Sequence, residues 1–338
     1  MCPVKMSNIW ISIVNYRTPE LTIECLRALS SQVVALANIS VVVVDNNSGD
    51  GSDTKLAVAI ESESWSSWVK LVPMEKNGGF AFGNNVCIRL AQASPVPVDY
   101  IMLLNPDTVV HTEAVKVLID FMDAHPDVGI AGSQLKNADG SVECSAHTFP
   151  SPLSELDGAA RLGMISRILH RYVVTHPAQA EAHACDWVSG ASMIIRRQVI
   201  EDIGLMDEGF FLYFEEVDFC HRAKLTGWEC WHVPDSKVVH LEGASTGINA
   251  TAKRRAGYWY DSRRRFFIKH YGITGLIGAD ILWATGRISY VLRRSLRLGV
   301  RNDQNIDPKW VMFDLLWGDM RAMLTGQAWG IGRTGKQV

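Results

Sequence analysis

Apolar and polar positions in the first 110 residues follow two alternating periods. Four apolar runs, rich in β-branched residues, have the length of buried strands, at residues 8–14, 39–44, 69–73 and 100–104. Three intervening segments have apolar residues at helical spacing, at residues 18–29, 53–61 and 82–93. Thr18 and Pro19 stand where helices prefer to begin. Strands that alternate with helices predict an α/β fold whose sheet is mostly parallel and has helices on both faces.

Small polar and acidic residues follow three of these strands. They are Asn15, the run 45–48 and the run 105–107. The carboxyl ends of parallel strands meet at one edge of a sheet, and ligands bind there in open α/β folds. Pro106 cannot continue a central strand, so the chain must turn and present Asp107 at this edge. A carboxylate there suits a hard divalent cation, although Asp107 also fits the cap of a helix near residues 112–122.

The pattern changes after about residue 130. Residues 136–185 have no regular period and contain many turn-forming residues, so we expect an irregular segment there. Beyond it, the sequence predicts a strand at 193–196, a helix at 197–203 and another helix within 204–227. Two further strand-like runs, at 229–233 and 238–240, are separated by a predicted turn at Pro234 and Asp235.

Three acids lie within four residues in the 204–227 segment. They are Glu215, Glu216 and Asp218, and aromatic residues precede and follow them. If a helix begins here, Glu215 and Asp218 share one face while Glu216 points elsewhere, and Arg222 reaches Asp218. Adjacent carboxyls beside apolar groups acquire raised pKa values, which suits a general base. The structural alternative is an acidic first turn that the helix dipole favours.

Two further features gain meaning only in combination with others. The segment 77–85 is rich in Gly and Asn and precedes a predicted helix, where the backbone can approach an anionic ligand. It matches neither a P-loop nor the GxGxxG pattern, so alone it is a weak signal.

His240 ends a β-branched run. A lone histidine is more often structural than a ligand, and a metal role requires Asp107 nearby.

Seven segments, taken in order, resemble the inverting family 2 glycosyltransferases with a GT-A fold, and above all their bacterial rhamnosyltransferase-like members. The segments are residues 13–16, 44–48, 77–81, 104–107, 187–191, 213–218, and His240 with 242–245. The resemblance covers roughly residues 8–272. It implies a GT-A-type domain over residues 1–272, with a donor half of about 1–130 and an acceptor and catalytic half of about 131–272. Residues 273–338 would then form a basic amphipathic helical region.

The resemblance also implies where a nucleotide-sugar donor and its metal bind. The residues expected to contact the donor are Asn15, Asp45, Asn47, Asn77, Gly79, Asn84, Asn85 and Asp107. Asp107 stands at the last position of the family's DXD-type motif and would hold Mg²⁺ or Mn²⁺ together with His240. Asn105 occupies the usual first acid position of that motif. The protein would therefore offer the metal one carboxylate from this motif.

The implied reaction is sugar transfer with inversion in one metal-assisted displacement. Glu216 stands where the family usually has its catalytic aspartate, and Glu215 and Asp218 are further candidates for the base. The acceptor is expected to contact Trp187, Ser189, Gly190 and Tyr213. The expected donor is dTDP-rhamnose, with a UDP-sugar as the alternative, and the expected acceptor is a glycan or polyprenyl-diphosphate-linked glycan of the cell envelope. A nucleotidylyltransferase and a non-catalytic nucleotide-sugar-binding protein are the alternatives, although the basic Gly-rich loop typical of the former is missing.

Composition and charge bear on the compartment. With 47% hydrophobic and 20% charged residues, the chain is an ordinary globular protein, and its seven cysteines form no CxxC pair. The net charge of -3 conceals an asymmetry, because residues 253–301 hold twelve basic and two acidic residues. Apolar and basic residues interleaved at helical spacing predict an interfacial helix on anionic lipid. Packing of this segment on the acidic body is an alternative, and nucleic-acid binding, which we do not expect, lacks an accompanying fold.

A signal peptide and a membrane-spanning run are not apparent in the sequence. We therefore expect reduced thiols and a cytoplasmic protein that is peripheral at the inner face of the cell membrane.

Overall fold

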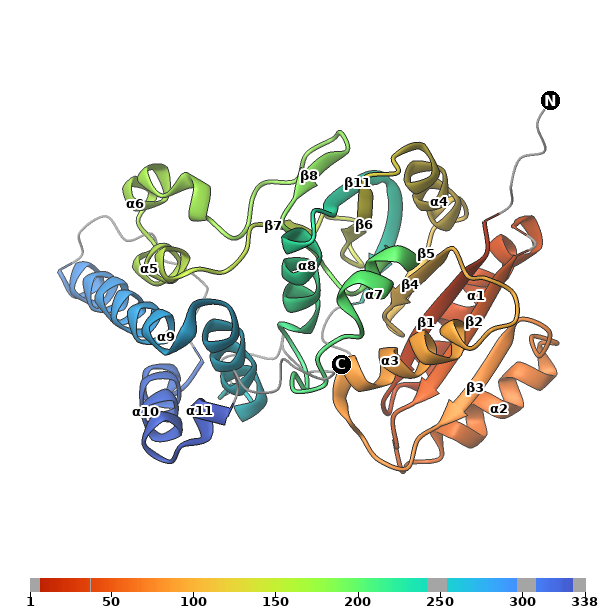
Figure 1. The fold of residues 1–338 in the computed structure, drawn as a ribbon, viewed down its shortest axis with the longest axis horizontal. Helices are drawn as coiled ribbons and strands as arrows, with labels where there is room; N and C mark the ends of the chain where they lie inside the picture. Colours follow the sequence, from red (N-terminus) through yellow and green to blue (C-terminus); the bar gives the residue numbers. More distant parts are fainter. Residues whose placement is uncertain (1–6, 37, 242–253, 297–307, 331–338) are drawn as a thin grey trace. The chain divides into compact units, whose positions relative to one another are not determined.

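The computed structural model describes residues 7–36, 38–241, 254–296 and 308–330 (Figure 1). The expected motif at 242–245, together with Cys2, Lys253, Arg297 and Arg301, lies outside these described residues. The chain divides into two compact units. The first contains residues 7–147, 177–211 and 215–241, and the second contains residues 148–176, 212–214 and the described residues from 254 onward.

The first unit is built on a mixed, nine-stranded sheet with the order β3-β2-β1-β4-β10-β6-β11-β5, and β8 pairs with β11 (Figure 1). Four parallel strands form one half, namely β1 (Ile9–Asn15), β2 (Ile39–Asp45), β3 (Val69–Pro73) and β4 (Tyr100–Leu104). β10 (Ser192–Arg196) runs antiparallel between β4 and β6 (Val128–Lys136). β11 (Glu229–His240) is parallel to β6 and antiparallel to β5 (Thr108–Val110) and β8 (His183–Cys185). A separate pair joins β7 (Ala146–His147) to β9 (Trp187–Val188).

Alternating side chains place the two faces of this sheet under different helices. The odd-numbered residues Ile9, Ile11 and Ile13 of β1 join the main core, which α1 (Pro19–Ala35), α2 (Ser52–Ser62) and α4 (Ala114–Ala124) cover. Val42 and Val44 of β2 face the other side and pack with α3 (Gly79–Gln92). The predicted fold class, a mostly parallel sheet with helices on both faces, is confirmed.

Two local predictions are wrong. The segment 136–185, expected to be irregular, contains α5 (Pro152–Ala160), α6 (Gly163–Ile168) and a 3₁₀ turn, η1 (His170–Tyr172). α5 begins with a capping box in which Ser154 N donates to Ser151 Oγ over 3.2 Å, a start signal that the many turn formers obscured. The turn predicted at Pro234 and Asp235 is a bulge inside the continuous strand β11. There, Ser236 Oγ donates to the carbonyl of Ala114, which fixes the bulge against α4.

The predicted helix at 197–203 is α7 (Arg197–Ile203), and the acidic segment enters α8 (Glu215–Leu225). The second unit is helical and contains α5, α6, α9 (Gly257–Ser295), α10 (Val311–Leu324) and α11 (Gln327–Gly330) (Figure 1). The expected domain boundary at residue 272 falls inside α9, at a kink where Gly272 has a φ of 70°. No helix in the described part of the chain is long and apolar enough to cross a membrane.

Ion pairs hold the second unit together internally. The Arg263 side chain is 1% exposed and contacts Glu155 of α5 at 3.0 Å, Asp280 of α9 at 2.9 Å and Asp319 of α10 at 3.1 Å. Arg264 Nε donates to Asp319 over 2.6 Å. The positive charges of Arg263 and Arg264 are therefore balanced inside this unit, and fewer arginines are available to a partner than the composition predicted.

Candidate functional site

The first part of the site is the edge formed by the carboxyl ends of β1 and β2. Asn15 and Asp45 lie in register, and Asn15 Nδ2 donates to Asp45 Oδ1 over 2.7 Å. Ser48 adds two bonds to the same carboxylate, from Oγ to Oδ1 at 2.6 Å and from its backbone N to Oδ2 at 3.1 Å. Asn15 and Asp45 are both buried. The carboxylate is thus held rigidly at the edge where the sequence predicted polar residues to converge.

Asn46 belongs to the predicted polar run 45–48 but was not among the residues expected to contact the donor. Its Nδ2 donates to Asn77 Oδ1 and to the carbonyl of Gly79, both over 3.0 Å, and its Oδ1 accepts from Gly78 N at 3.3 Å. It therefore joins the β2 edge to the Gly-rich segment at 77–79. The available signal was its position, because a polar side chain directly after a buried strand needs hydrogen-bond partners. Asn47 next to it has a φ of 55°, is exposed and donates to the carbonyl of Glu75.

Gly79 is required by a close approach between two backbone segments. Its φ is +87°, and a Cβ atom there would lie 2.0 Å from the carbonyl oxygen of Phe211. Phe80 N donates to the same oxygen over 2.9 Å, so the 77–80 loop is fastened to the segment that leads toward Glu215. The sequence predicted that glycine would admit a ligand here, and the neighbour in this structure is the protein's own backbone.

The two asparagines of α3 differ in what their amides do. Both ends of the Asn85 side-chain amide bind the backbone of Met206. Its Oδ1 accepts from Met206 N over 3.0 Å, and its Nδ2 donates to the carbonyl of Met206 over 2.9 Å. Asn84 Nδ2 donates to the carbonyl of Phe80, and its Oδ1 is buried with no hydrogen-bond partner among the described residues. Of the two, Asn84 keeps an acceptor available for a ligand.

The carboxylates of the acidic segment occupy the first turn of α8. Glu215 is buried and Glu216 is partly exposed, and the Oε2 atom of each is buried without a hydrogen-bond partner in the described structure. Burial raises the pKa of Glu216 to about 7. Burial, and then the charge of Glu216, raise the pKa of Glu215 well above its usual value. The side chain of Asp218 is fully buried and pairs with Arg222 Nε at 2.9 Å, as the spacing predicted.

The backbone just before these carboxylates is strained. Tyr213 and Phe214 have φ values of 70° and 68°, a left-handed conformation that costs a bulky residue about 1–3 kcal/mol. Both residues belong to the second unit, where the Tyr213 ring stacks with Tyr258 and the Phe214 ring packs against Trp259 and Phe266. Strain of this kind is typical of functional segments.

The segment 189–191 adjoins Glu216. A Cβ atom on Gly190 would lie 3.7 Å from Glu216 Cβ and 3.3 Å from Phe80 Cε1, and Ala191 accepts a hydrogen bond from Asn105 N. Gly190 therefore lies directly beside Glu216 and Phe80, so that a side chain at this position would contact both residues. Of the other residues expected at the acceptor, Trp187 stacks on His147 with centroids 4.2 Å apart, and Ser189 N donates to the carbonyl of Ser145.

Asp107 and His240 meet where β5 pairs with β11. Asp107 Oδ1 lies 3.5 Å from His240 Nε2, and Glu143, which the sequence did not single out, lies 3.4 Å from His240 Nδ1. Burial alone would lower the pKa of His240, but hydrogen bonds and charges from Asp107 and Glu143 outweigh it and raise this pKa to about 9. The alternative in which Asp107 caps the following helix is wrong, because the N-cap residue of α4 is Glu113.

Asp107 provides an oxygen ligand for a cation, and His240 provides a nitrogen ligand once its ring has lost a proton. A carboxylate and an imidazole suit Mg²⁺ less well than Mn²⁺, which accepts both oxygen and nitrogen ligands. The described part of the chain contains no group of three or more His, Cys, Asp or Glu residues that could hold a metal ion. The residues present therefore fit a cation whose remaining ligands come from a bound phosphate.

A mixed sheet with this strand order, a fixed acid at the β2 edge and buried acids on α8 defines the class of protein. The fold is that of the GT-A glycosyltransferases. Among solved structures, the mannosyltransferase PcManGT from Pyrobaculum calidifontis, in complex with GDP-Man and Mn²⁺, superposes with a TM-score of 0.53 at 14% identity, covering 98% of this chain and 83% of that one.

The sequence comparison then gives the family. The model of the family described as "Glycosyltransferase like family 2" matches residues 7–262, and the chain belongs to this family. It is 26% identical over 250 residues to the N-acetylglucosaminyl-diphospho-decaprenol L-rhamnosyltransferase of Mycobacterium tuberculosis, covering 65% of this chain and 77% of the relative. It is 27% identical over 266 residues to the dTDP-rhamnosyl transferase RfbF of Shigella flexneri, covering 78% and 80%. The chain is therefore a glycosyltransferase, which decides among the function classes that the sequence left open.

Proposed function

We propose that the enzyme transfers rhamnose from dTDP-rhamnose, with inversion, to a glycan acceptor linked to a polyprenyl diphosphate. The names of the two rhamnosyltransferase relatives support this donor and this acceptor class. The observation that carries the proposed chemistry is the Oε2 atom of Glu216, which is buried next to Gly190 and has no hydrogen-bond partner among the described residues.

Glu216 is the proposed general base. A base works best when its pKa lies near the working pH, and burial raises the pKa of Glu216 to about 7. The acceptor hydroxyl oxygen forms a bond to the anomeric carbon while its proton passes to Glu216. The bond from that carbon to the nucleoside diphosphate breaks on the opposite side, so one displacement inverts the configuration. Asp218 is committed to Arg222 and serves in this proposal as an anchor of α8.

The donor nucleotide is proposed to bind at the β1 and β2 edge. Asp45 Oδ2 accepts one bond from Ser48 N and keeps further lone pairs, which suits a base N–H. Asn15 holds this carboxylate in place, and the 77–79 loop that Asn46 fastens would line the sugar and the diphosphate together with Asn84. Asn85 is assigned a structural role because both ends of its amide are used on Met206.

Asp107 and His240 would hold a divalent cation on the diphosphate. The complex of the Pyrobaculum mannosyltransferase with Mn²⁺ supports a divalent cation in a protein of this fold. When bound, such a cation neutralises charge on the leaving diphosphate. The two carboxylates that flank His240 make this corner attractive to positive charge even before a ligand arrives. A polyprenyl-linked acceptor would place the enzyme at the cytoplasmic face of an anionic membrane.

The test of the base is the variant Glu216→Gln, which keeps the size of the side chain and removes its basicity. We expect kcat to fall by about 10²- to 10⁴-fold while the donor dissociation constant stays unchanged. Glu216→Asp, which supplies the residue usual in this family, should retain part of the activity. Glu201→Gln is the control, because Glu201 forms an exposed ion pair with Arg197 on α7. Full activity of Glu216→Gln contradicts the assignment, and loss of activity only in Glu215→Gln transfers the role to Glu215.

The test of the donor is a thermal-shift panel of nucleotide sugars. A ligand that binds only the folded state raises the unfolding temperature in proportion to the logarithm of its concentration over its dissociation constant. We expect dTDP-rhamnose to give the largest shift. A larger shift with a UDP-sugar contradicts the rhamnose proposal and leaves the base assignment intact.

A further inference from the structure

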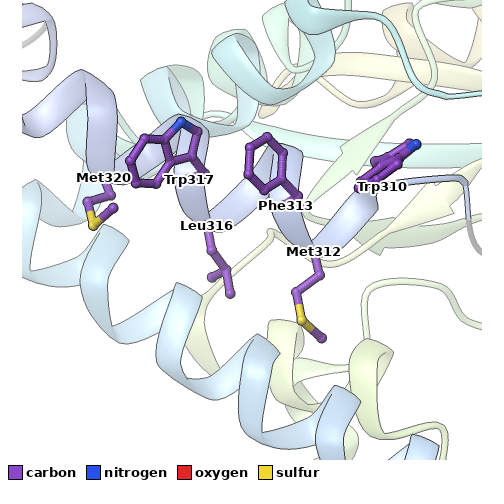
Figure 2. Close-up of a pocket in the computed structure, with 6 residues that line it drawn as sticks. All are labelled: Trp310, Met312, Phe313, Leu316, Trp317 and Met320. Atoms are coloured by element: carbon purple, nitrogen blue, oxygen red, sulfur yellow. The ribbon is translucent and has the colours of Figure 1, made fainter.

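α10 exposes the side that helices usually bury. Five apolar residues recur along it at intervals of three and four positions, and we call them the aromatic face of α10. They are Trp310 just before the helix, Phe313, Trp317, Met320 and Leu324, and they are 66%, 52%, 48%, 40% and 78% exposed. Figure 2 shows Trp310, Phe313 and Trp317 in one row. Their rings contact one another, with centroids 6.3 and 6.2 Å apart, and together with Met312, Leu316 and Met320 they line an apolar pocket of about 500 Å³.

The packed side of α10 carries its acids. Asp319 is 1% exposed and binds Arg263 and Arg264, and Asp314 forms a bidentate pair with Arg254. Gly318 lets the helix approach α9 closely, because a Cβ atom there would lie 3.3 Å from an Arg264 nitrogen. α10 is thus fixed to its unit by these ion pairs together with the buried Leu315 and Ala322, and it turns its aromatic residues outward. Its aromatic side chains therefore lie on a side that is not packed, whereas an amphipathic helix usually packs such a stripe.

The charges around the aromatic face favour an anionic surface. Asp314 and Asp319 are the two acids of residues 308–330, and arginines neutralise both. Lys309 and Arg321 are exposed. Aromatic and aliphatic residues combined with exposed cations are typical of helices that lie in the interface of an anionic bilayer. Tryptophan in particular is enriched at the boundary between lipid and water.

A second exposed apolar set lies on α9 of the same unit. Its members Ile277, Ile281, Ile288 and Leu292 are between 40% and 60% exposed. A soluble protein rarely exposes apolar surface of this extent without a partner. A helix of 14 residues is only about 21 Å long, so α10 by itself offers less than the roughly 800 Å² per partner that stable dimers bury.

We propose that the aromatic face of α10 docks into the interfacial region of an anionic lipid bilayer. The proposal rests on the proposed function in one respect, since a polyprenyl-linked acceptor lies in such a bilayer. It assigns membrane contact to the aromatic residues of α10, with Lys309 and Arg321 as auxiliary charges.

The experiment is vesicle flotation of the full-length protein. The vesicles are equal mixtures of phosphatidylglycerol and phosphatidylcholine, with pure phosphatidylcholine vesicles as the neutral comparison. The test variant is Phe313→Ser combined with Trp317→Ser. Tyr172→Ser is the matched control, because Tyr172 is an aromatic residue of the same unit, is 42% exposed and lies outside α10. Circular dichroism and the unfolding temperature verify that each variant folds.

We expect the wild-type protein and Tyr172→Ser to float with the anionic vesicles, and the double variant to bind at least about tenfold more weakly. Binding by the wild type should persist in part at 1 M salt, because apolar burial is not screened. Equal binding by the double variant and the wild type overturns the proposal, as does no flotation of the wild type. A wild-type dimer in solution that the double variant converts to a monomer, without vesicle binding, identifies a second copy as the occupant instead.

A separate readout distinguishes this proposal from the proposed function. Transfer to a water-soluble acceptor and the donor thermal shift should be unchanged in the double variant, and Glu216→Gln should still float. If the wild type floats and the double variant does not, the membrane proposal stands even when no sugar transfer is detected. If transfer occurs and the wild type does not float, the proposed function stands and the docking proposal fails.

Discussion

The contact between Gly79 and the carbonyl of Phe211 gives a sharp test of how the donor loop is held. The change is Gly79→Ala. Alanine at a φ of +87° costs about 1–2 kcal/mol, because a left-handed backbone brings Cβ against the following carbonyl. The new Cβ would also lie 2.0 Å from Phe211 O, well inside the 3.0 Å that real Cβ contacts respect, so the two segments must separate.

Separation breaks the hydrogen bond from Phe80 N to Phe211 O, which is 2.9 Å long. An amide left unsatisfied in a partly buried position costs about 1–3 kcal/mol. The expected loss of unfolding free energy for Gly79→Ala is therefore about 2–5 kcal/mol, the sum of the backbone cost and the lost bond. Because the 77–79 loop is proposed to line the donor, the donor dissociation constant should also rise.

Gly140→Ala is the matched control for this prediction. Gly140 has a φ of +82° but no atom within 4 Å of its would-be Cβ, so alanine there meets the backbone cost alone. Urea unfolding followed by circular dichroism measures both variants, and donor titration measures binding. We expect Gly140→Ala to lose about 1–2 kcal/mol and to bind donor normally. Equal losses in the two variants would refute the reasoning, since the approach of Phe211 would then carry no energy.

Two further predictions concern buried charges. Burial raises the pKa of Asp280 to about 7, against the opposing pull of Arg263, so this group stabilises the fold below pH 4 and loses that contribution as the pH rises through 7. Asp280→Asn mimics the protonated form. Its unfolding temperature relative to that of the wild type should therefore rise between pH 5 and pH 8. A difference in unfolding temperature that stays constant over this range contradicts the prediction. Arg222→Met removes the guanidinium that pairs with the buried carboxylate of Asp218 and should cost about 3–5 kcal/mol in chemical denaturation, whereas Arg197→Met at an exposed pair should cost less than about 1 kcal/mol.

The parts of the fold that the sequence predicted are those fixed by local period. β1 to β4 and the helices between them were predictable because each strand alternates or stays apolar throughout and each helix repeats at 3.6 residues. The convergence of Asn15 and Asp45 followed from the rule for parallel strands. α5 was not predicted, because its start signal is a single Ser and Pro pair inside a turn-rich segment.

Long-range pairings account for what the sequence left undecided at the site. Glu143 reaches His240 across 97 positions of sequence, and Asn46 reaches Gly79 across 33, so no local pattern reveals either contact. The pair of Asp218 and Arg222 was predictable because both residues lie on one helix, four positions apart. The sequence could therefore predict which residue types belong to the site. Only the tertiary structure distinguishes side chains that are hydrogen-bonded within the protein, such as Asp218 and Asn85, from one that could act on a ligand, such as Glu216.

The charge of the second unit shows a further limit of predictions made from amino-acid composition. A buried guanidinium without a carboxylate partner costs several kcal/mol, and the side chains of Arg263 and Arg264 are 1% and 10% exposed. Asp319 meets this demand from α10, so the charged side of that helix is the side that packs against α9. The aromatic residues, spaced as a stripe that ordinarily faces a core, must then face outward. In the proposed docking, the contribution of the basic segment is therefore indirect: its arginines orient α10, and the tryptophans that this orientation exposes would provide the apolar contact with the bilayer.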